Sequence, residues 1–197
     1  MINAMFEQLA KSVQQSIALS SEQLQMISHY FIPKKLRKRQ YVQNAGEASK
    51  HMVFVEKGLL RSFSVDPDGH EHVMQFATEG WWIADMASFL SGEDSIYNIE
   101  ALEDCELLLL TKTSMDKLID EVPVIERYFR LLMQETIIAL QRRLRVVQTH
   151  SAEETYLQFM EARPDVVARA PQQHIALYLG ITPETLSRVR KQISQRK

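Results

Sequence analysis

The residues of this sequence that are best suited to binding a charged partner lie close to its end. Residues 183–197 contain five basic side chains and one acidic side chain. Arginine, serine, glutamate and glutamine hydrogen-bond the edges of nucleic-acid bases, and arginine and lysine bind phosphates. We therefore expect a nucleic-acid-binding surface here, and its candidate residues are Gln173, Thr182, Glu184, Thr185, Ser187, Arg188 and Lys191.

Two short helices joined by a tight turn are predicted to position these side chains, over residues 173–192. Gly180 can adopt the left-handed conformation that ends a first helix. Thr182 is a good N-cap and Pro183 a good first residue for a second helix. The apolar seam between the helices is predicted from Ile175, Ala176, Leu179, Ile181, Leu186 and Val189. This pattern is typical of a helix-turn-helix motif, and its alternative is an ordinary helical hairpin with a solvated basic face.

Composition limits how such a surface can arise. The chain has 197 residues, enough for one large domain or two small ones, and 45% of them are hydrophobic, enough for a real core. Its net charge is −2, so any DNA contact must come from a local basic patch. The single cysteine, Cys105, excludes an internal disulfide, an iron–sulfur cluster and a cysteine-rich zinc site.

The location of the protein is also suggested by the sequence. The first thirty residues contain no long apolar segment, and no stretch is long enough to span a bilayer. A lone cysteine fits a reducing compartment, where Cys105 is expected to act as a small buried hydrophobe. We therefore expect a cytoplasmic protein.

The first half of the chain is predicted to be rich in β-structure. Glycines recur about every dozen residues between positions 46 and 92, and a turn of type Asp-Pro-Asp-Gly spans residues 66–69. Strands are predicted at residues 52–55, 59–65, 72–76 and 105–110. Short strands at regular spacing indicate a barrel or roll.

Two segments precede these strands. A helix capped by Ser20 or Ser21 is predicted to place Leu24, Ile27 and Phe31 on one face and to close at Pro33. The basic run at residues 34–39 is expected to lead into a strand and to form a solvated sheet edge, rather than to bind phosphates.

A long helix is predicted from Pro123 to about His150, without an internal proline or glycine. Its apolar residues recur at intervals of four and three, the pattern of a helix that packs on a partner along its length. We expect a dimer interface formed by Phe129, Met133, Ile137, Leu140, Leu144 and Val147. The alternative is a helix buried within a monomer. A capping box at residues 151–154 then opens a further helix that stops before Pro164, which suggests a hinge at residues 149–151.

The order of roll, long helix and helix-turn-helix resembles the Crp/Fnr family of bacterial transcription regulators. The resemblance is carried by residues 173–192, by the turns at 46–47, 57–58 and 68–69, and by residues 101–107. It implies an α+β chain. Residues 1–120 would form a sensor β-roll (a double-stranded β-helix, cyclic-nucleotide-binding-like), 121–150 a dimerisation helix, and 151–197 an all-α DNA-binding domain with a reduced wing.

The resemblance also implies a function. Such a protein is a homodimer that reads an inverted repeat in double-stranded DNA, and RNA polymerase and a small ligand are further partners to consider. Residues matching Glu184, Ser187 and Arg188 enter the major groove, and those matching Gln173 and Thr182 approach the backbone. Many relatives have arginine where this chain has Pro183, so its base preference is expected to differ.

The sensor segment departs from the family pattern. Ala84-Asp85 stands where cyclic-nucleotide binders have Gly-Glu, and Ser95-Ile96 where they have an arginine followed by serine or threonine. Without that arginine the charge-assisted clamp on the cyclic phosphate is lost, so cyclic AMP binding is not expected. The effector remains unknown, and the residues that would line its pocket are Trp82, Asp85, Met86, Ser95 and Tyr97, with Trp81 and Phe89 as aromatic neighbours or core.

Two other functions compete with this interpretation. His70, Glu71, His72 and Glu79 faintly resemble the metal-binding motif of cupin enzymes, although the spacing to the acid differs and no second motif follows. Alternatively, the chain is a sensor that binds a small molecule or a protein, and its helix-turn-helix does not bind DNA.

Overall fold

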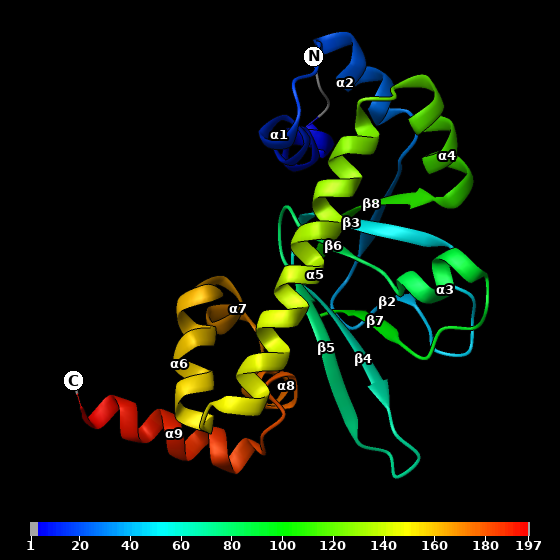
Figure 1. Ribbon diagram of the computed structural model, residues 1–197. Helices are drawn as coiled ribbons and strands as arrows, with labels where there is room; N and C mark the ends of the chain where they lie inside the picture. The colour runs from blue at the N-terminus through cyan, green and yellow to red at the C-terminus, as the bar shows by residue number, and fades with distance from the viewer. Residues whose placement is uncertain (1–3, 197) are drawn as a thin grey trace.

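The computed structural model describes residues 4–196 as an N-terminal β-roll, a long helix and a group of C-terminal helices (Figure 1). The roll consists of two four-stranded antiparallel sheets, ordered β1-β8-β3-β6 and β2-β7-β4-β5. The strands are β1 Ile32–Leu36, β2 Tyr41–Gln43, β3 His51–Lys57, β4 Leu60–Val65, β5 Glu71–Ala77, β6 Trp82–Ile83, β7 Asn98–Ala101 and β8 Cys105–Thr111. All four predicted strands are confirmed.

The turns explain why the strands end where they do. Asp66 closes the β4–β5 hairpin because its Oδ1 atom accepts hydrogen bonds from the amides of Asp68 and His70. Gly58, between β3 and β4, has a φ of 107°, and a Cβ atom there would lie 2.9 Å from the carbonyl oxygen of Asp104. Only glycine allows this close approach of the two turns.

The N-terminal helices are η1 Ala4–Phe6, α1 Glu7–Ser16 and α2 Ser21–Ser28. Ser20 caps α2 with a capping box, as predicted, but α2 ends at Ser28. Phe31 is buried outside the helix, and Pro33 lies in β1, so the prediction that this helix extends to Pro33 is wrong. The basic run starts inside β1, an edge strand, and continues through the turn that precedes β2.

Helix α4 Lys112–Glu121 leads into α5 Ile125–Thr149, which crosses the molecule from the roll to the C-terminal helices (Figure 1). The start of α5 is buried at Ile125, Tyr128 and Phe129. Farther along, the side chains of the predicted seam are exposed: Ile137 55%, Leu140 55%, Leu144 60% and Val147 59%. The alternative of a helix buried within the monomer is therefore wrong for the second part of α5. In the first part, Phe129 of the predicted seam is buried in the monomer and Met133 packs against the same core.

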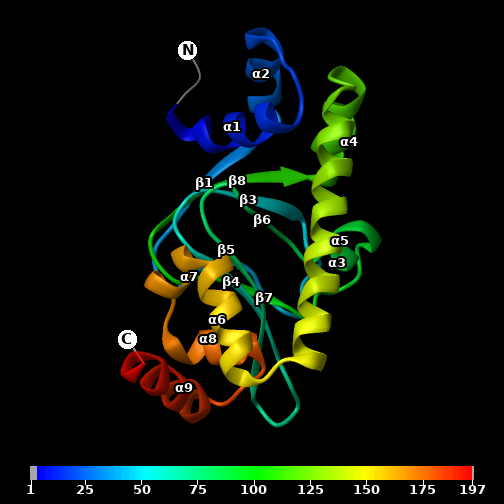
Figure 2. The ribbon, with the colours of Figure 1, turned by 60° about the vertical axis from the view of Figure 1, so that its left-hand side comes forward.

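The C-terminal helices are α6 Ala152–Ala162, α7 Pro164–Arg169, α8 Gln172–Leu179 and α9 Pro183–Gln195. They lie beside the long β4–β5 hairpin and the second half of α5 (Figure 2). Val73 and Phe76 of β5 share one apolar core with Phe159, Ile175 and Leu179. No helix within residues 4–196 is long and apolar enough to cross a membrane.

Candidate nucleic-acid interface and sensor site

The helix-turn-helix is formed by α8 and α9, and its turn has the predicted chemistry. Gly180 ends α8 in the left-handed conformation with φ of 70°. The side chain of Thr182 accepts a hydrogen bond of 3.2 Å from the amide of Thr185, and Pro183 is the first residue of α9. Of the predicted seam, Ile181 is half-buried, and the buried members are Ile175, Ala176, Leu179, Leu186 and Val189.

Most of the candidate DNA-binding residues are exposed. Gln173, Thr182, Glu184, Ser187, Arg188 and Lys191 are exposed, and Thr185 is half-buried. Positions 184, 187, 188 and 191 share one face of α9 because they are spaced by three and four residues. Within the described part of the chain, no polar partner engages the guanidinium of Arg188, and it is free to reach a ligand.

Two other basic residues near the end of the chain differ from this group. The guanidinium of Arg196 forms an ion pair with Glu153 of α6, so its charge is used within the protein. Lys197 lies outside the described residues, which end one residue beyond α9. The reduced wing therefore stays a prediction.

In the roll, the candidate ligand residues Asp85 and Ser95 bind each other. Asp85 is 8% exposed and Ser95 2% exposed. Ser95 Oγ donates a 2.8 Å hydrogen bond to Asp85 Oδ2, while Asp85 Oδ1 accepts from the amides of Ala87 and Ser88. Asp85 thus acts as the N-cap of the short helix α3 Met86–Ser91. Both oxygens of this carboxylate are engaged inside the protein.

The surrounding backbone closes the same region further. The amide of Ser95 donates to the carbonyl of Glu47, and the carbonyl of Ser95 accepts from Gly46. Ser88 Oγ accepts from the amide of Ser49 and donates to the carbonyl of Glu93. Helix α3 is therefore held by hydrogen bonds of Ser88 to the segment before β3 and to the loop that follows the helix.

A cyclic phosphate would also need a cation, and the buried cation of the roll is already paired. Arg61 of β4 is 4% exposed. Its guanidinium binds Glu71 at 2.5 Å and Glu100 at 2.7 Å, and it stacks over the ring of Phe63. Two carboxylates neutralise this arginine. The residues at the sensor site thus do not fit a cyclic nucleotide.

The large apolar candidates for the sensor pocket are buried or half-buried. Trp82 is buried against Phe31, Phe54 and Phe129, and its Nε1 donates a 2.8 Å hydrogen bond to the hydroxyl of Tyr128. The prediction of Trp82 as a pocket-lining residue is wrong, because its ring belongs to the core that joins the roll to α5. Phe89 belongs to the same core. Met86 and Tyr97 are half-buried.

The cupin-like pattern is not assembled. Glu71 pairs with Arg61, and Glu79 pairs with Arg169 of α7. His70 and His72 lie beside Asp66 in the hairpin turn instead. The hydrogen bond from His72 is the main reason why the pKa of Asp66 falls to about 2. The two glutamates of the predicted pattern therefore serve as ion-pair partners.

Helix α7 was missed by the sequence analysis. The sequence predicts that α6 stops before Pro164, which it does, and Pro164 is in addition the first residue of α7. Proline suits both roles, since it cannot continue a helix yet favours the first helical position. Arg163 and Arg169, at the two ends of α7, both bind the roll. These contacts join positions 66 to 90 residues apart, so no local sequence signal predicts them.

Comparisons with known proteins agree with this architecture. Residues 33–122, which span the roll and α4, match the family described as cyclic nucleotide-binding domain. The regulatory protein HlyX of Actinobacillus pleuropneumoniae is 25% identical to this chain, and the alignment covers 87% of this chain and 75% of HlyX. Along most of its length the chain is thus similar to regulators of the Crp/Fnr type. The resemblance stated from the sequence is thus confirmed.

Other Crp/Fnr proteins are similar over comparable lengths. The transcriptional activator protein anr of Pseudomonas aeruginosa is 26% identical over 78% of this chain and 67% of its own length. The structure of FixK2 from Bradyrhizobium japonicum is similar in fold, with a TM-score of 0.71 and 20% identity over 84% of this chain and 85% of FixK2. The predicted α+β fold class is confirmed by this likeness.

Proposed function

We propose that this protein is a transcription regulator of the Crp/Fnr type that binds double-stranded DNA as a homodimer and reads an inverted repeat. The observation that carries the proposal is the free face of α9, on which Glu184, Ser187, Arg188 and Lys191 project from a helix fixed by a buried seam. A recognition helix in the major groove presents such side chains to base edges.

The exposed seam of α5 supports the homodimer. Leu140, Leu144 and Val147 are each more than half exposed on one helix. Such a row of large apolar side chains is costly in water and is suited to the same row on a second copy. A twofold dimer presents two recognition helices to successive major grooves about 34 Å apart.

The sensor and the other partners form a second part of the proposal. The Asp85–Ser95 pair takes the place of the nucleotide contacts, so we propose an effector other than cyclic AMP, or none. Action in the cytoplasm, with RNA polymerase as a further partner, fits a regulator of this kind. The relatives are transcription regulators, and we propose no enzymatic activity for this chain.

A salt titration tests the proposal. Binding of the purified protein to a mixed pool of duplexes should weaken as salt is raised, because Lys and Arg release counterions from phosphates. A site selected from that pool should be an inverted repeat. If no duplex shifts even at low salt, the chain is a sensor that does not bind DNA.

A further inference from the structure

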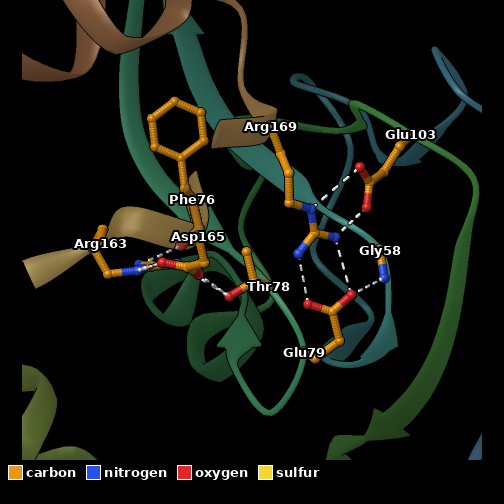
Figure 3. Close-up of polar contacts among 8 residues, drawn as sticks. All are labelled: Gly58, Phe76, Thr78, Glu79, Glu103, Arg163, Asp165 and Arg169. Carbon is orange, nitrogen blue, oxygen red and sulfur yellow. Dashed lines mark hydrogen bonds and ion pairs between the residues drawn. The ribbon is translucent and has the colours of Figure 1, made fainter. Parts of the chain in front are cut away.

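A group of ion pairs joins α7 to the roll (Figure 3). Arg169 donates to both oxygens of Glu79, at 2.8 and 3.0 Å, and its guanidinium also binds Glu103. Glu79 Oε1 accepts a further 2.7 Å hydrogen bond from the amide of Gly58. Arg169 is thus held by two carboxylates of the roll, and one of them, Glu79, is fixed in turn by the amide of Gly58.

The other end of α7 is bound to the same loop. Asp165 accepts a 2.7 Å hydrogen bond from the hydroxyl of Thr78, and Arg163 pairs with Asp165 at 3.2 Å (Figure 3). The guanidinium of Arg163 also lies 4.1 Å from the ring centre of Trp81. Residues 78–82 therefore contact both ends of α7, and Trp82 also contacts Tyr128 of α5.

The charges at this interface are well matched. Burial alone would raise the pKa of Glu79, but hydrogen bonds from Arg169 and from the Gly58 amide outweigh it, so the pKa is lowered. The pKa of Asp165 is lowered in the same way, by Arg163 and Thr78 against the effect of burial. Both carboxylates are more stable as anions at the interface than in water.

The connection between α5 and α6 is short, and the orientation of the C-terminal helices depends on their contacts with other parts of the protein. Only His150 and Ser151 separate the two helices. Within residues 4–196, no side chain of α5 forms a hydrogen bond or ion pair with α6; His150 and Ser151 of the connection bind Gln158 and Glu154 of α6. Arg143 of α5 instead binds the carbonyls of Met74 and Tyr178, on β5 and α8. The C-terminal helices are thus oriented by contacts with the roll and by Arg143 of α5.

We propose that Glu79 and Arg169 are positioning residues for DNA recognition. Their ion pair fixes α7 on the roll, and through α7 it fixes the orientation of α9 relative to α5. In a dimer joined by α5, this direction sets the distance between the two recognition helices and therefore the spacing of the half-sites. The inference rests on the proposed function. The docked arrangement leaves the α9 face and the α5 seam exposed, so it is compatible with both DNA binding and dimer formation.

The test compares half-site spacings. The wild type, Arg169→Met and Glu79→Gln are titrated against a selected operator and against versions with one to three base pairs inserted at its centre. Arg127→Met is the matched control, because Arg127 is exposed on α5 and, among the described residues, forms no ion pair. When the C-terminal helices are released from the roll, a smaller fraction of the protein has the arrangement that binds the operator. We therefore expect both variants to bind the operator with the best spacing about tenfold more weakly than wild type.

The discriminating result is the shape of the spacing profile. Arg169→Met and Glu79→Gln should bind the lengthened operators nearly as well as the original, whereas wild type and Arg127→Met should reject them. Loss of affinity by the same factor at every spacing, or an unchanged profile, would overturn the inference. A wild type that binds no duplex would instead overturn the proposed function, and with it this role of the ion pair.

A second measurement monitors, in the absence of DNA, whether α7 is docked on the roll. Trp81 is 43% exposed beneath Arg163, so its fluorescence reports whether α7 is in place. Acrylamide quenching of Trp81, obtained by difference from Trp81→Phe, should rise in Arg169→Met while the circular dichroism stays that of the folded protein. Unchanged quenching would show that α7 stays docked without this ion pair and would overturn the inference.

Discussion

Ser95 donates a hydrogen bond to Asp85 at the place where cyclic-nucleotide binders of this family have an arginine and a glutamate. The pair caps α3 and closes the sensor region with the protein's own groups. A cyclic phosphate entering here would meet the carboxylate of Asp85, and the buried arginine described above, Arg61, is already paired with two glutamates. The desolvated phosphate would therefore have no cationic partner from that arginine.

We therefore predict that cyclic AMP does not bind with micromolar affinity. Calorimetry with the purified protein should show no saturable heat up to millimolar nucleotide. Ser95→Arg adds the missing cation, but we expect little gain, because Asp85 would pair with the new arginine. A micromolar dissociation constant for the wild type would contradict this account of the site.

The dimer is predicted to depend on the middle and end of α5. Leu140→Glu together with Leu144→Glu should give monomers or insoluble protein, since an unpaired charge in an apolar interface costs several kcal/mol. Gln134→Glu, an exposed position outside the predicted seam, is the matched control. Light scattering at micromolar concentration measures the outcome, and a well-folded wild-type monomer would rule out the seam as an interface.

Local patterns in the sequence predict β3, β4, β5, β8 and the helix-turn-helix. Thr182, Pro183 and Gly180 each have a specific backbone preference, so the turn between α8 and α9 could be predicted residue by residue. The roll was predicted less completely. Three of its longer strands stand out because they lie among glycine turns, and β8 because it is a run of leucines, whereas β1, β2, β6 and β7 have no such signal.

Contacts between distant segments could not be predicted. Arg169 pairs with Glu79, 90 positions away in the sequence, and Arg61 pairs with Glu100, 39 positions away. No local sequence pattern predicts either pair. Trp82 could equally line a pocket or fill the core, and only the packing of Phe54 and Phe129 against it decides. Side-chain pairing of this kind depends on the three-dimensional fold.

His174 predicts a pH dependence of stability. This histidine on α8 is half-buried, and its Nδ1 atom is buried with no hydrogen-bond partner in the described structure. Burial lowers its pKa, and Arg61 lowers it further, whereas Glu71 and Glu100 oppose the shift. The unfolded chain, with a histidine pKa of about 6.5, therefore binds this proton more readily than the folded chain.

It follows that the contribution of His174 to the free energy of unfolding is complete above about pH 6.5 and falls as the pH drops toward its lowered folded pKa. The largest slope that one proton can give is about 1.4 kcal/mol per pH unit. His174→Gln should remove that slope from thermal melts between pH 7.5 and 5.5, while His29→Gln, at an exposed position on the surface, should leave it in place. Parallel melting curves for wild type and His174→Gln would contradict this role.

The last prediction concerns the residue that reads the bases. Arg188 lies one turn after Glu184 on the exposed face of α9, and its guanidinium can bind O6 and N7 of one guanine together. Arg188→Ala should weaken operator binding by about 1–3 kcal/mol per half-site and relax the preference at one base position.

Arg190→Ala provides the comparison, because Arg190 is exposed on the same helix but lies outside the set predicted to read bases. We expect that variant to bind all sequences somewhat more weakly and with a smaller salt dependence, as the loss of a phosphate contact does. Sequencing of sites selected by each protein distinguishes the two effects. If wild type and Arg188→Ala select the same bases, Arg188 contacts only phosphate, and the base-reading residue must be sought elsewhere on α9.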